Sequence, residues 1–234
     1  MPKVLALVPA RAGSKGLKNK NLLKVHGKYL LEWISEVVSS SDLVDKLICS
    51  TDSREIAALA FKLGYDVDIR PEKYATDDSK IIDTILHVIK KKVISNYDYL
   101  LLLQATSPCI VRSDINRALD AALEYDYDTV ISAYKDEHVS FSTLFFPCKN
   151  NLVTSLDVHS SPDDRRQDSI YPYIRAGLFY LFKIPTILKL TSLYGGRTGY
   201  VLVPKSRTAN LDHPDDLLVL SNQLKALNDD IRFN

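Results

Sequence analysis

The residues best suited to chemistry lie in one basic segment near the start of the chain. The apolar run Val4 to Val8 has the length of a buried strand, and the segment Pro9 to Asn21 follows it directly. Gly13 and Gly16 permit backbone conformations with positive φ and let main-chain N–H groups approach a ligand closely. Four cations accompany these glycines: Arg11, Lys15, Lys18 and Lys20. The segment therefore predicts a binding site for an anion at one edge of a sheet.

The glycine spacing of this segment excludes the two commonest phosphate-binding motifs. It matches neither the P-loop pattern GxxxxGK[ST] nor the dinucleotide pattern GxGxxG. A dehydrogenase with a dinucleotide cofactor is therefore set aside. The alternative to an anion site is an ordinary solvated basic loop, although such loops rarely follow a first strand so tightly.

The segment resembles the nucleotide-binding signature of the cytidylyltransferases that activate sialic acid and related ulosonic acids. That signature reads Pro-Ala-Arg-x-Gly-Ser-Lys-Gly-x-x-x-Lys-Asn, and every position of it is filled here. Later segments are similar to the family's other landmarks in the same order: Ser50–Ser53, Arg70–Pro71, Leu103–Pro108 and Asn210–Leu217. The resemblance covers most of the chain, and it implies that CTP is the nucleotide.

Composition limits the class of protein and its partners. A chain of 234 residues suits one α/β domain, 1–234, with a core of substantial size. Lys and Arg number 30 against 29 Asp and Glu, so no global basic field favours nucleic acid and a small anion is expected instead. Cys49, Cys109 and Cys148 form neither a disulfide framework nor a zinc pattern, which fits a reducing cytoplasm. No apolar run reaches the ~20 residues of a membrane span, and the N-terminus has no leader pattern.

The rest of the chain alternates between strand-like and helix-like patterns. Tyr99 to Leu103 is apolar at every position, as expected of a central parallel strand covered on both faces. Other strands are expected at Leu47–Cys49, Val67–Ile69, Thr129–Ala133, Ala176–Phe182 and Tyr200–Val203. Helices are expected around Leu30–Val38, Ser53–Leu63, Ile81–Ile89, Ser113–Tyr125, Pro185–Leu193 and Pro214–Leu227. This order predicts a doubly wound, mostly parallel, Rossmann-like α/β sheet.

The alternation breaks between about residues 134 and 173. Short aromatic and β-branched pieces separated by turn residues predict a β-hairpin in this insertion. Its apolar residues exceed what a small hairpin can bury alone: Phe141, Leu144, Phe145, Phe146, Leu152 and Val153. We therefore expect a homodimer formed through the insertion, and the resemblance implies the same.

The nucleotide is expected to lie along the first loop. Arg11, Ser14 and Lys20 suit the phosphates, and the amide of Asn21 both donates and accepts, as recognition of cytosine requires. The resemblance assigns these positions similarly, includes Ala10, Gly13 and Lys15 in the signature, and adds Arg70 near the base. For Arg70 alone, an ion pair at a strand end is the alternative. Ser79 is a further candidate near the base, and a helix cap is its alternative role.

The acceptor is expected at the carboxyl edge of the central strand. Gln104 stands there, and the resemblance places a glutamine against the acceptor sugar. Arg166 and Gln167 suit a sugar-acid carboxylate, contributed in the family by the partner chain; a solvated loop is the alternative. Tyr180 is expected beside the sugar as a stacking wall, with core packing as its commoner role.

Two departures from the family pattern concern this acceptor. Ala176 stands where sialic-acid-activating relatives have the Asn of Asn-Gly, and Ser142 stands where they carry a lysine. Both changes reduce hydrogen bonding to the acceptor, which puts sialic acid itself in question while leaving CTP in place.

The segment Asn210-Leu211-Asp212 occupies the position of the family's Asp-x-Asp metal motif. Alternate residues of an extended segment point the same way, so Asn210 and Asp212 can converge on one ion. The first carboxylate is absent, so Mg²⁺ is expected to bind more weakly, or Mn²⁺ to be preferred. The alternative is that both residues cap a turn and the last helix.

The resemblance, together with these residues, implies a Mg²⁺-dependent cytidylyltransferase that joins CTP to a 3-deoxy-2-keto sugar acid and releases pyrophosphate. Arg11, Lys20 and Asp212 are the expected catalytic residues. One alternative is a nucleotidyltransferase that uses another nucleotide or a non-ulosonic acceptor. The other is a nucleotide-binding protein without catalysis.

Overall fold

The computed structural model describes most of the chain. The described residues are 1–13, 16–91, 96–139, 144–147, 153–155, 171–189, 192–227 and 229–233. Of the residues expected in the site, Ser14, Lys15, Arg166 and Gln167 lie outside these ranges.

Seven strands form one mixed sheet in the order β11-β7-β10-β6-β1-β4-β5. Their bounds are β1 (Val4–Pro9), β4 (Lys46–Thr51), β5 (Asp66–Ile69), β6 (Tyr99–Leu103), β7 (Thr129–Lys135), β10 (Tyr173–Lys183) and β11 (Thr198–Leu202). β10 is antiparallel to both of its neighbours, β6 and β7, and the other pairs are parallel. The predicted α/β class and mostly parallel sheet are confirmed, but β6 has a parallel neighbour on one side only.

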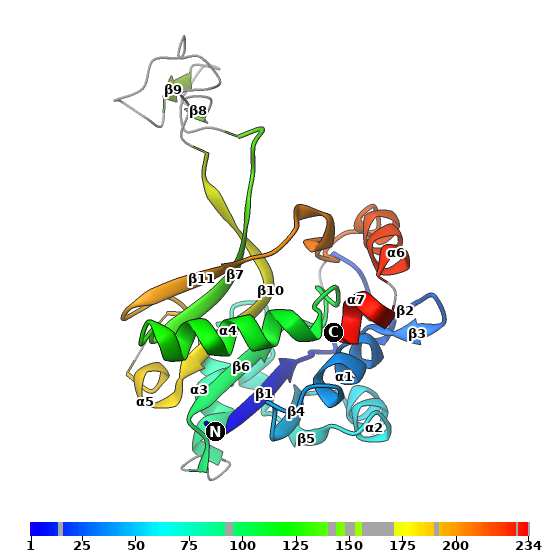
Figure 1. Ribbon diagram of the computed structural model, residues 1–234. Helices are drawn as coiled ribbons and strands as arrows, with labels where there is room; N and C mark the ends of the chain where they lie inside the picture. The colour runs from blue at the N-terminus through cyan, green and yellow to red at the C-terminus, as the bar shows by residue number, and fades with distance from the viewer. Residues whose placement is uncertain are drawn as a thin grey trace.

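Helices cover both faces of this sheet (Figure 1). Their bounds are α1 (Leu30–Ser39), α2 (Arg54–Lys62), α3 (Ile81–Lys91), α4 (Arg112–Glu124), α5 (Ile184–Ile187), α6 (Asp216–Ala226) and α7 (Asp229–Phe233). One core cluster joins the sheet to α1, α2, α4 and α6, and a second cluster joins its other face to α3 and α5. Alternate residues of each strand face opposite sides, so Ala6 belongs to the first core and Leu5 to the second.

Local sequence signals account for most helix boundaries. Ser53 accepts a hydrogen bond from the Ile56 N–H and caps α2, and Gly64 takes φ +85° just after that helix, as expected. α5 ends at Ile187, so the longer helix expected from Pro185 to Leu193 is wrong within the described residues. α7 and a short hairpin of β2 (Lys24–Val25) and β3 (Lys28–Tyr29) were not anticipated.

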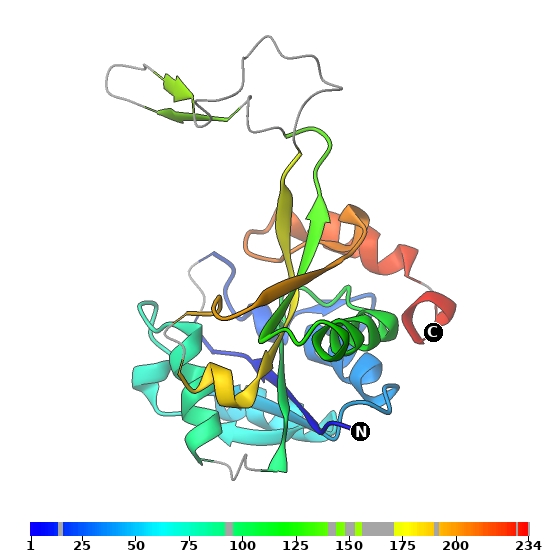
Figure 2. The ribbon, with the colours of Figure 1, turned by 60° about the vertical axis from the view of Figure 1, so that its left-hand side comes forward.

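The predicted hairpin of the insertion is present. β7 and β10 remain paired out to Lys135 and Tyr173, and β8 (Phe145–Pro147) pairs with β9 (Val153–Ser155) beyond them. Figure 2 shows this hairpin standing away from the helices and the large sheet. Phe141 and Leu152, two of the apolar residues expected at a dimer contact, lie outside the described residues.

Within the described part of the chain, no helix combines the length and the apolar character needed to cross a membrane.

Candidate active site

A cleft of about 290 Å³ opens where β1 and β6 end. It is lined by Pro9, Arg11, Lys20, Asn21, Arg70, Tyr74, Thr76, Asp77, Ser79, Ile81, Thr84, Gln104, Ala105 and Thr106. Six residues expected in the site thus meet in one cavity: Arg11, Lys20, Asn21, Arg70, Ser79 and Gln104. The carboxyl ends of neighbouring strands bring these segments together, as in other open α/β sheets.

Arg11 is fixed by the segment that precedes α3. Its Nη1 donates to the Thr76 carbonyl oxygen at 2.9 Å and, at 3.5 Å, to that of Ala75. Its Nη2 lies 2.8 Å from Asp77 Oδ1. The guanidinium is therefore held at the cleft by one carboxylate and two carbonyl groups. The sequence analysis did not anticipate the ion pair with Asp77.

The two glycines of the first loop differ in their surroundings. Neither Gly13 nor Gly16 is among the glycines with positive φ, so neither uses the left-handed conformation that glycine permits. A Cβ on Gly16 would lie 2.2 Å from the Asp212 carbonyl oxygen, whereas a Cβ on Gly13 would meet nothing within 4 Å. Gly16 is thus needed for close approach to the distant Asp212 segment. Asp52 supports the same loop, because its Oδ1 accepts a hydrogen bond from the Ala12 N–H at 2.9 Å.

Asn21 and Ala10 connect the loop to the sheet. Asn21 is buried, and its Nδ2 donates to the Arg11 carbonyl oxygen at 2.9 Å. Ala10 is fully buried, and its N–H donates to the Ser50 carbonyl oxygen at 2.9 Å. The amide of Asn21 therefore has a fixed orientation at the wall of the cleft.

Arg70 is a buried cation on the same wall. Arg70 is the residue directly after β5, and its Nη1 donates to Thr84 Oγ1 at 3.0 Å. Burial lowers the pKa of Arg70, and the negative charge of nearby Asp52 acts against this shift. Its Nε is buried without a hydrogen-bond partner. Arg70 also lines the cleft, so its guanidinium places a positive charge at this wall.

Ser79 does not cap α3. Its Oγ donates to the Lys73 carbonyl oxygen at 2.9 Å and lies 2.7 Å from Thr76 Oγ1. These contacts fold the segment 73–79 back on itself beside the cleft, so the alternative role as a helix cap is wrong.

Gln104 and Tyr180 are the two described residues that were expected beside the acceptor. Gln104 lines the cleft, as expected. Tyr180 is 1% exposed, and its ring packs parallel to that of Phe182 in the core at 6.3 Å between centroids. Burial raises the pKa of Tyr180 to about 12. The aromatic ring thus packs in the core, while the expectation that Tyr180 contacts the sugar stays a prediction.

The segment Asn210–Asp212 lies against the first loop. Lys20 Nζ is 2.9 Å from Asp212 Oδ1, and Asn210 Nδ2 donates to Asp212 Oδ2. Asn210 Oδ1 in turn accepts a hydrogen bond from Ser107 Oγ at 3.1 Å, and the Leu211 N–H donates to the Thr106 carbonyl oxygen. A hydrogen-bonded chain therefore links Ser107, Asn210, Asp212 and Lys20 across the site.

Asp212 is the described carboxylate best placed to bind a divalent metal ion beside the first loop. Among the described residues, no group of three or more His, Cys, Asp or Glu side chains could hold a metal ion on its own. Asp212 offers one carboxylate beside the basic loop, and its side chain is 54% exposed. A single exposed carboxylate suits an ion that shares its remaining ligands with a triphosphate.

Sequence reasoning missed Asp77, Thr84 and Ser107, which fix Arg11, Arg70 and Asn210 respectively. Thr84 carried a signal, since it is a polar residue on the buried face of α3 beside Ile81 and Ile85. Asp77 and Ser107 carried none, because their partners are distant in the sequence.

The sheet, the basic first loop and the cleft at its carboxyl edge define a nucleotide-binding α/β enzyme. The sequence model of the cytidylyltransferase family matches residues 5–229, and the chain belongs to that family. The predicted family and class of enzyme are thereby confirmed.

Several named proteins are similar to this chain. The N-acylneuraminate cytidylyltransferase of Escherichia coli is 41% identical over 106 residues, which are 45% of this chain and 25% of that protein. The post-translational flagellin modification protein B of Campylobacter coli is 26% identical over 97% of both chains. The pseudaminic acid cytidylyltransferase of Campylobacter jejuni is 24% identical over 92% of this chain and 93% of that one.

Solved structures agree with the fold. A CMP:2-keto-3-deoxy-manno-octonic acid synthetase complexed with CTP superposes with a TM-score of 0.70, 17% identity, and coverage of 96% of this chain and 99% of that chain. A 4-diphosphocytidyl-2C-methyl-D-erythritol synthase from Anaerococcus prevotii gives a TM-score of 0.65 at 13% identity, with the same coverage. At such identities the likeness concerns the fold alone.

Proposed function

We propose that this protein transfers the cytidylyl group of CTP to the anomeric hydroxyl of a 3-deoxy-2-keto sugar acid. The hydroxyl oxygen forms a bond to the α-phosphorus of CTP, and the bond from that phosphorus to the bridging oxygen of the β-phosphate breaks. The hydroxyl proton is released, and the products are a CMP-sugar and pyrophosphate. The observation that carries this proposal is the meeting of Arg11, Lys20, Asn21, Arg70 and Gln104 in one cleft.

The residues that line the cleft suit both the phosphates and the base of a nucleotide. Arg11 and Lys20 place two cations where a triphosphate needs charge neutralisation. Asn21 and the guanidinium of Arg70 both line the cleft and provide polar groups of the kind that recognition of a base edge needs. Both cations are paired with carboxylates, Asp77 and Asp212, so the phosphates would replace or adjust these ion pairs on binding. Ser14 and Lys15 belong to the proposed phosphate contacts, and they lie outside the described residues.

The metal in this proposal is Mg²⁺, with Mn²⁺ as the alternative. Asp212 would hold it, with Asn210 as its neighbour, and the triphosphate would complete the ligands. A bound divalent ion neutralises phosphate charge and polarises phosphate oxygens. Lys20 pairs with Asp212 Oδ1 and so orients the carboxylate that would bind the metal ion.

The acceptor class is supported by the names of relatives that act on acylneuraminic and pseudaminic acids. Gln104 is the acceptor residue at the described part of the cleft, and Arg166 and Gln167 are proposed to reach the acceptor from the partner protomer. We propose that residues 1–234 form one domain and that the insertion at about 134–173 is its dimerisation subdomain.

Release of pyrophosphate tests the proposal. The purified protein is supplied with CTP, Mg²⁺ and one acceptor at a time: an N-acylneuraminic acid, pseudaminic acid, 2-keto-3-deoxy-manno-octonic acid or a sugar phosphate. Turnover with a sugar acid and CTP is expected, with ATP, GTP and UTP as inactive controls. Turnover with a sugar phosphate alone would overturn the acceptor class, and tight binding of CTP without turnover would favour a non-catalytic protein.

A further inference from the structure

The strand β10 leaves its regular pairing beside the cleft. Arg175 lies opposite Ala133 of β7, but Tyr180 lies opposite Ile131. Between these two pairs, β10 contains more residues than β7 does. The extra residues of β10 have no partner on β7 and form a bulge. Bulges are frequent next to active sites, where they redirect side chains.

The buried hydroxyl of Ser132 stabilises this bulge. Ser132 Oγ accepts hydrogen bonds from the Leu178 N–H at 3.0 Å and the Phe179 N–H at 3.2 Å, and it donates to the Phe179 carbonyl oxygen at 3.3 Å. Ser132 is fully buried. The side chain thus replaces ladder hydrogen bonds that the bulge removes, and the irregular backbone is a built feature of the fold.

The bulge brings its backbone against the cleft. Gly177 takes φ +75°, and a Cβ at this position would lie 3.1 Å from Gln104 Oε1. Gln104 is the cleft residue assigned to the acceptor. The bulge is therefore a direct neighbour of the acceptor side of the site.

Arg175 lies on the same face of the sheet as Gln104. Leu102 and Tyr180 are paired across β6 and β10 and belong to the same core, and Gln104 follows Leu102 by two residues. Arg175 Nη1 donates to the Tyr194 hydroxyl at 2.7 Å, and its guanidinium also interacts with the Tyr180 hydroxyl. Ala133 and Ile131, the β7 partners of Arg175 and Tyr180, are two residues apart, so Arg175 lies on the same face of the sheet as Tyr180 and Gln104.

We propose that Arg175 forms a subsite for the carboxylate of the acceptor sugar acid, beside Gln104. A guanidinium carries five N–H donors in a planar fork that matches a carboxylate, and the bond to Tyr194 orients this fork without using up its donors. The inference rests on the proposed function and adds to it a charged contact from the sheet of the same protomer.

Steady-state kinetics with separate titrations of CTP and acceptor test the subsite. Arg175→Met should raise KM for the sugar acid about ten-fold or more and leave KM for CTP unchanged, because one charge-assisted contact is lost from the acceptor only. Arg175→Lys keeps the charge without the planar fork and should give an intermediate KM. Tyr194→Phe removes the orienting hydroxyl and should raise the same KM by a few-fold.

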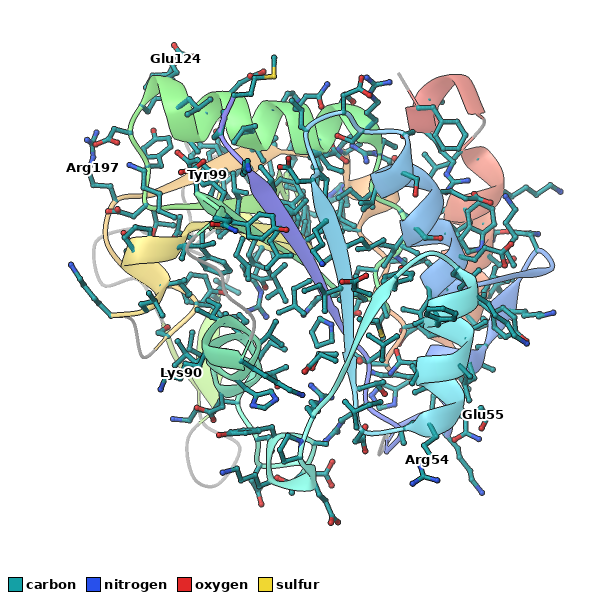
Figure 3. The ribbon with its side chains drawn as sticks, turned by 90° about the horizontal axis from the view of Figure 1, so that it is seen from below. Arg54, Glu55, Lys90, Tyr99, Glu124 and Arg197 are labelled. Atoms are coloured by element: carbon teal, nitrogen blue, oxygen red, sulfur yellow. The ribbon has the colours of Figure 1, made fainter. Side chains whose placement is uncertain are left out.

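Arg197→Met is the matched control. Arg197 is also an exposed arginine of this half of the chain, its Nη1 lies 3.9 Å from Asp126, and Figure 3 shows it at the periphery of the molecule. Its replacement should leave both KM values unchanged. Circular dichroism confirms the folding of each variant, and Arg175→Lys decides the matter if Arg175→Met does not fold.

The outcomes separate the subsite from the proposed function. If the wild-type protein turns over no sugar acid, the proposed function fails before any variant is compared. If the wild type is active and the folded Arg175 variants keep the wild-type KM for the sugar acid, the subsite is wrong. An equal rise of both KM values would indicate a structural role for Arg175 and would also overturn the proposal.

Discussion

Arg70 Nη1 donates a hydrogen bond to Thr84 Oγ1 at 3.0 Å, and both side chains are buried at the wall of the cleft. The bond joins the residue after β5 to the first turn of α3. Thr84 Oγ1 also donates to the Tyr74 carbonyl oxygen at 3.4 Å, so the hydroxyl is used in both directions. Thr84 is thereby placed to fix the orientation of the Arg70 guanidinium.

The first prediction concerns Thr84. Thr84→Val has nearly the same shape but leaves the Arg70 donor unsatisfied, so KM for CTP should rise about ten-fold while KM for the acceptor stays unchanged. Thr84→Ser restores the hydroxyl and should recover most of the wild-type KM. Initial rates over a CTP titration measure the effect. A Val variant with wild-type KM for CTP, or a Ser variant as impaired as Val, would contradict a positioning role.

The second prediction concerns Arg11 and Lys20. Both are polar loop residues outside the apolar core, so Arg11→Ala and Lys20→Ala should lose turnover by about 100-fold or more while the fold is retained. Rates at saturating CTP and acceptor, together with a thermal melt, separate the two effects. An unfolded variant, or an unchanged rate, would show that the assigned catalytic role is wrong.

The third prediction follows from the close approach of Gly16 to the Asp212 carbonyl oxygen. Gly16→Ala places a methyl group in backbone contact, so the loop must shift and the free energy of unfolding should fall by about 1–3 kcal/mol. Gly13→Ala is the matched variant, because nothing stands within 4 Å of its Cβ, and its stability should be nearly unchanged. Urea denaturation measures both. Equal free energies of unfolding for the two variants would show that the loop can shift away from Asp212 without loss of stability.

Local patterns in the sequence were sufficient for most of the fold. Tyr99 to Leu103 is apolar at every position, and β6 begins and ends at these two residues. The helix expected at Pro185 failed because Pro favours a first helical turn but says nothing about how many turns follow. The antiparallel direction of β10 was not predicted, since it depends on how the chain returns from the insertion.

Site residues could be predicted where they belong to one continuous sequence motif. Arg11, Lys20 and Asn21 belong to one continuous signature, and all three line the cleft. The partners Asp77 and Thr84 come from another segment, and only the folded chain shows which side chains they meet. The contact of Gly16 with the Asp212 segment joins the two ends of the chain, and no local pattern can indicate such a contact.

The fourth prediction is the homodimer formed through the insertion. The paired ends of β7 and β10 carry the β8–β9 hairpin away from the main sheet (Figure 2). A small hairpin cannot bury its own apolar residues, so a second copy of the chain is expected to cover them. Sedimentation velocity at micromolar concentration should give the mass of two chains. A monomer with full activity would refute both the dimer and the contribution of Arg166 from a partner.

The last prediction concerns Asn210 and Asp212. Asn210 donates through Nδ2 to Asp212 Oδ2 and accepts from Ser107, so its amide connects two neighbours instead of adding a negative charge. A site with one carboxylate should bind Mg²⁺ weakly until CTP supplies further charge. Asn210→Asp adds a second carboxylate and should lower the Mg²⁺ concentration for half-maximal turnover by about ten-fold, whereas Asp212→Asn should abolish most activity.

Turnover across a Mg²⁺ titration, repeated with Mn²⁺, measures both changes, and calorimetric binding of Mn²⁺ with and without CTP provides a readout that does not depend on activity. Ser107→Ala is the control for the hydrogen-bonded chain. It removes the donor to Asn210 but no charge, so it should change the metal requirement far less than Asn210→Asp does. If Asp212→Asn matched the wild type throughout both titrations, this segment would not hold the catalytic ion. The alternative that Asp212 caps the last helix is wrong, because the N-cap of α6 is Asp215 and the Asp212 carboxylate contacts Lys20 and Asn210.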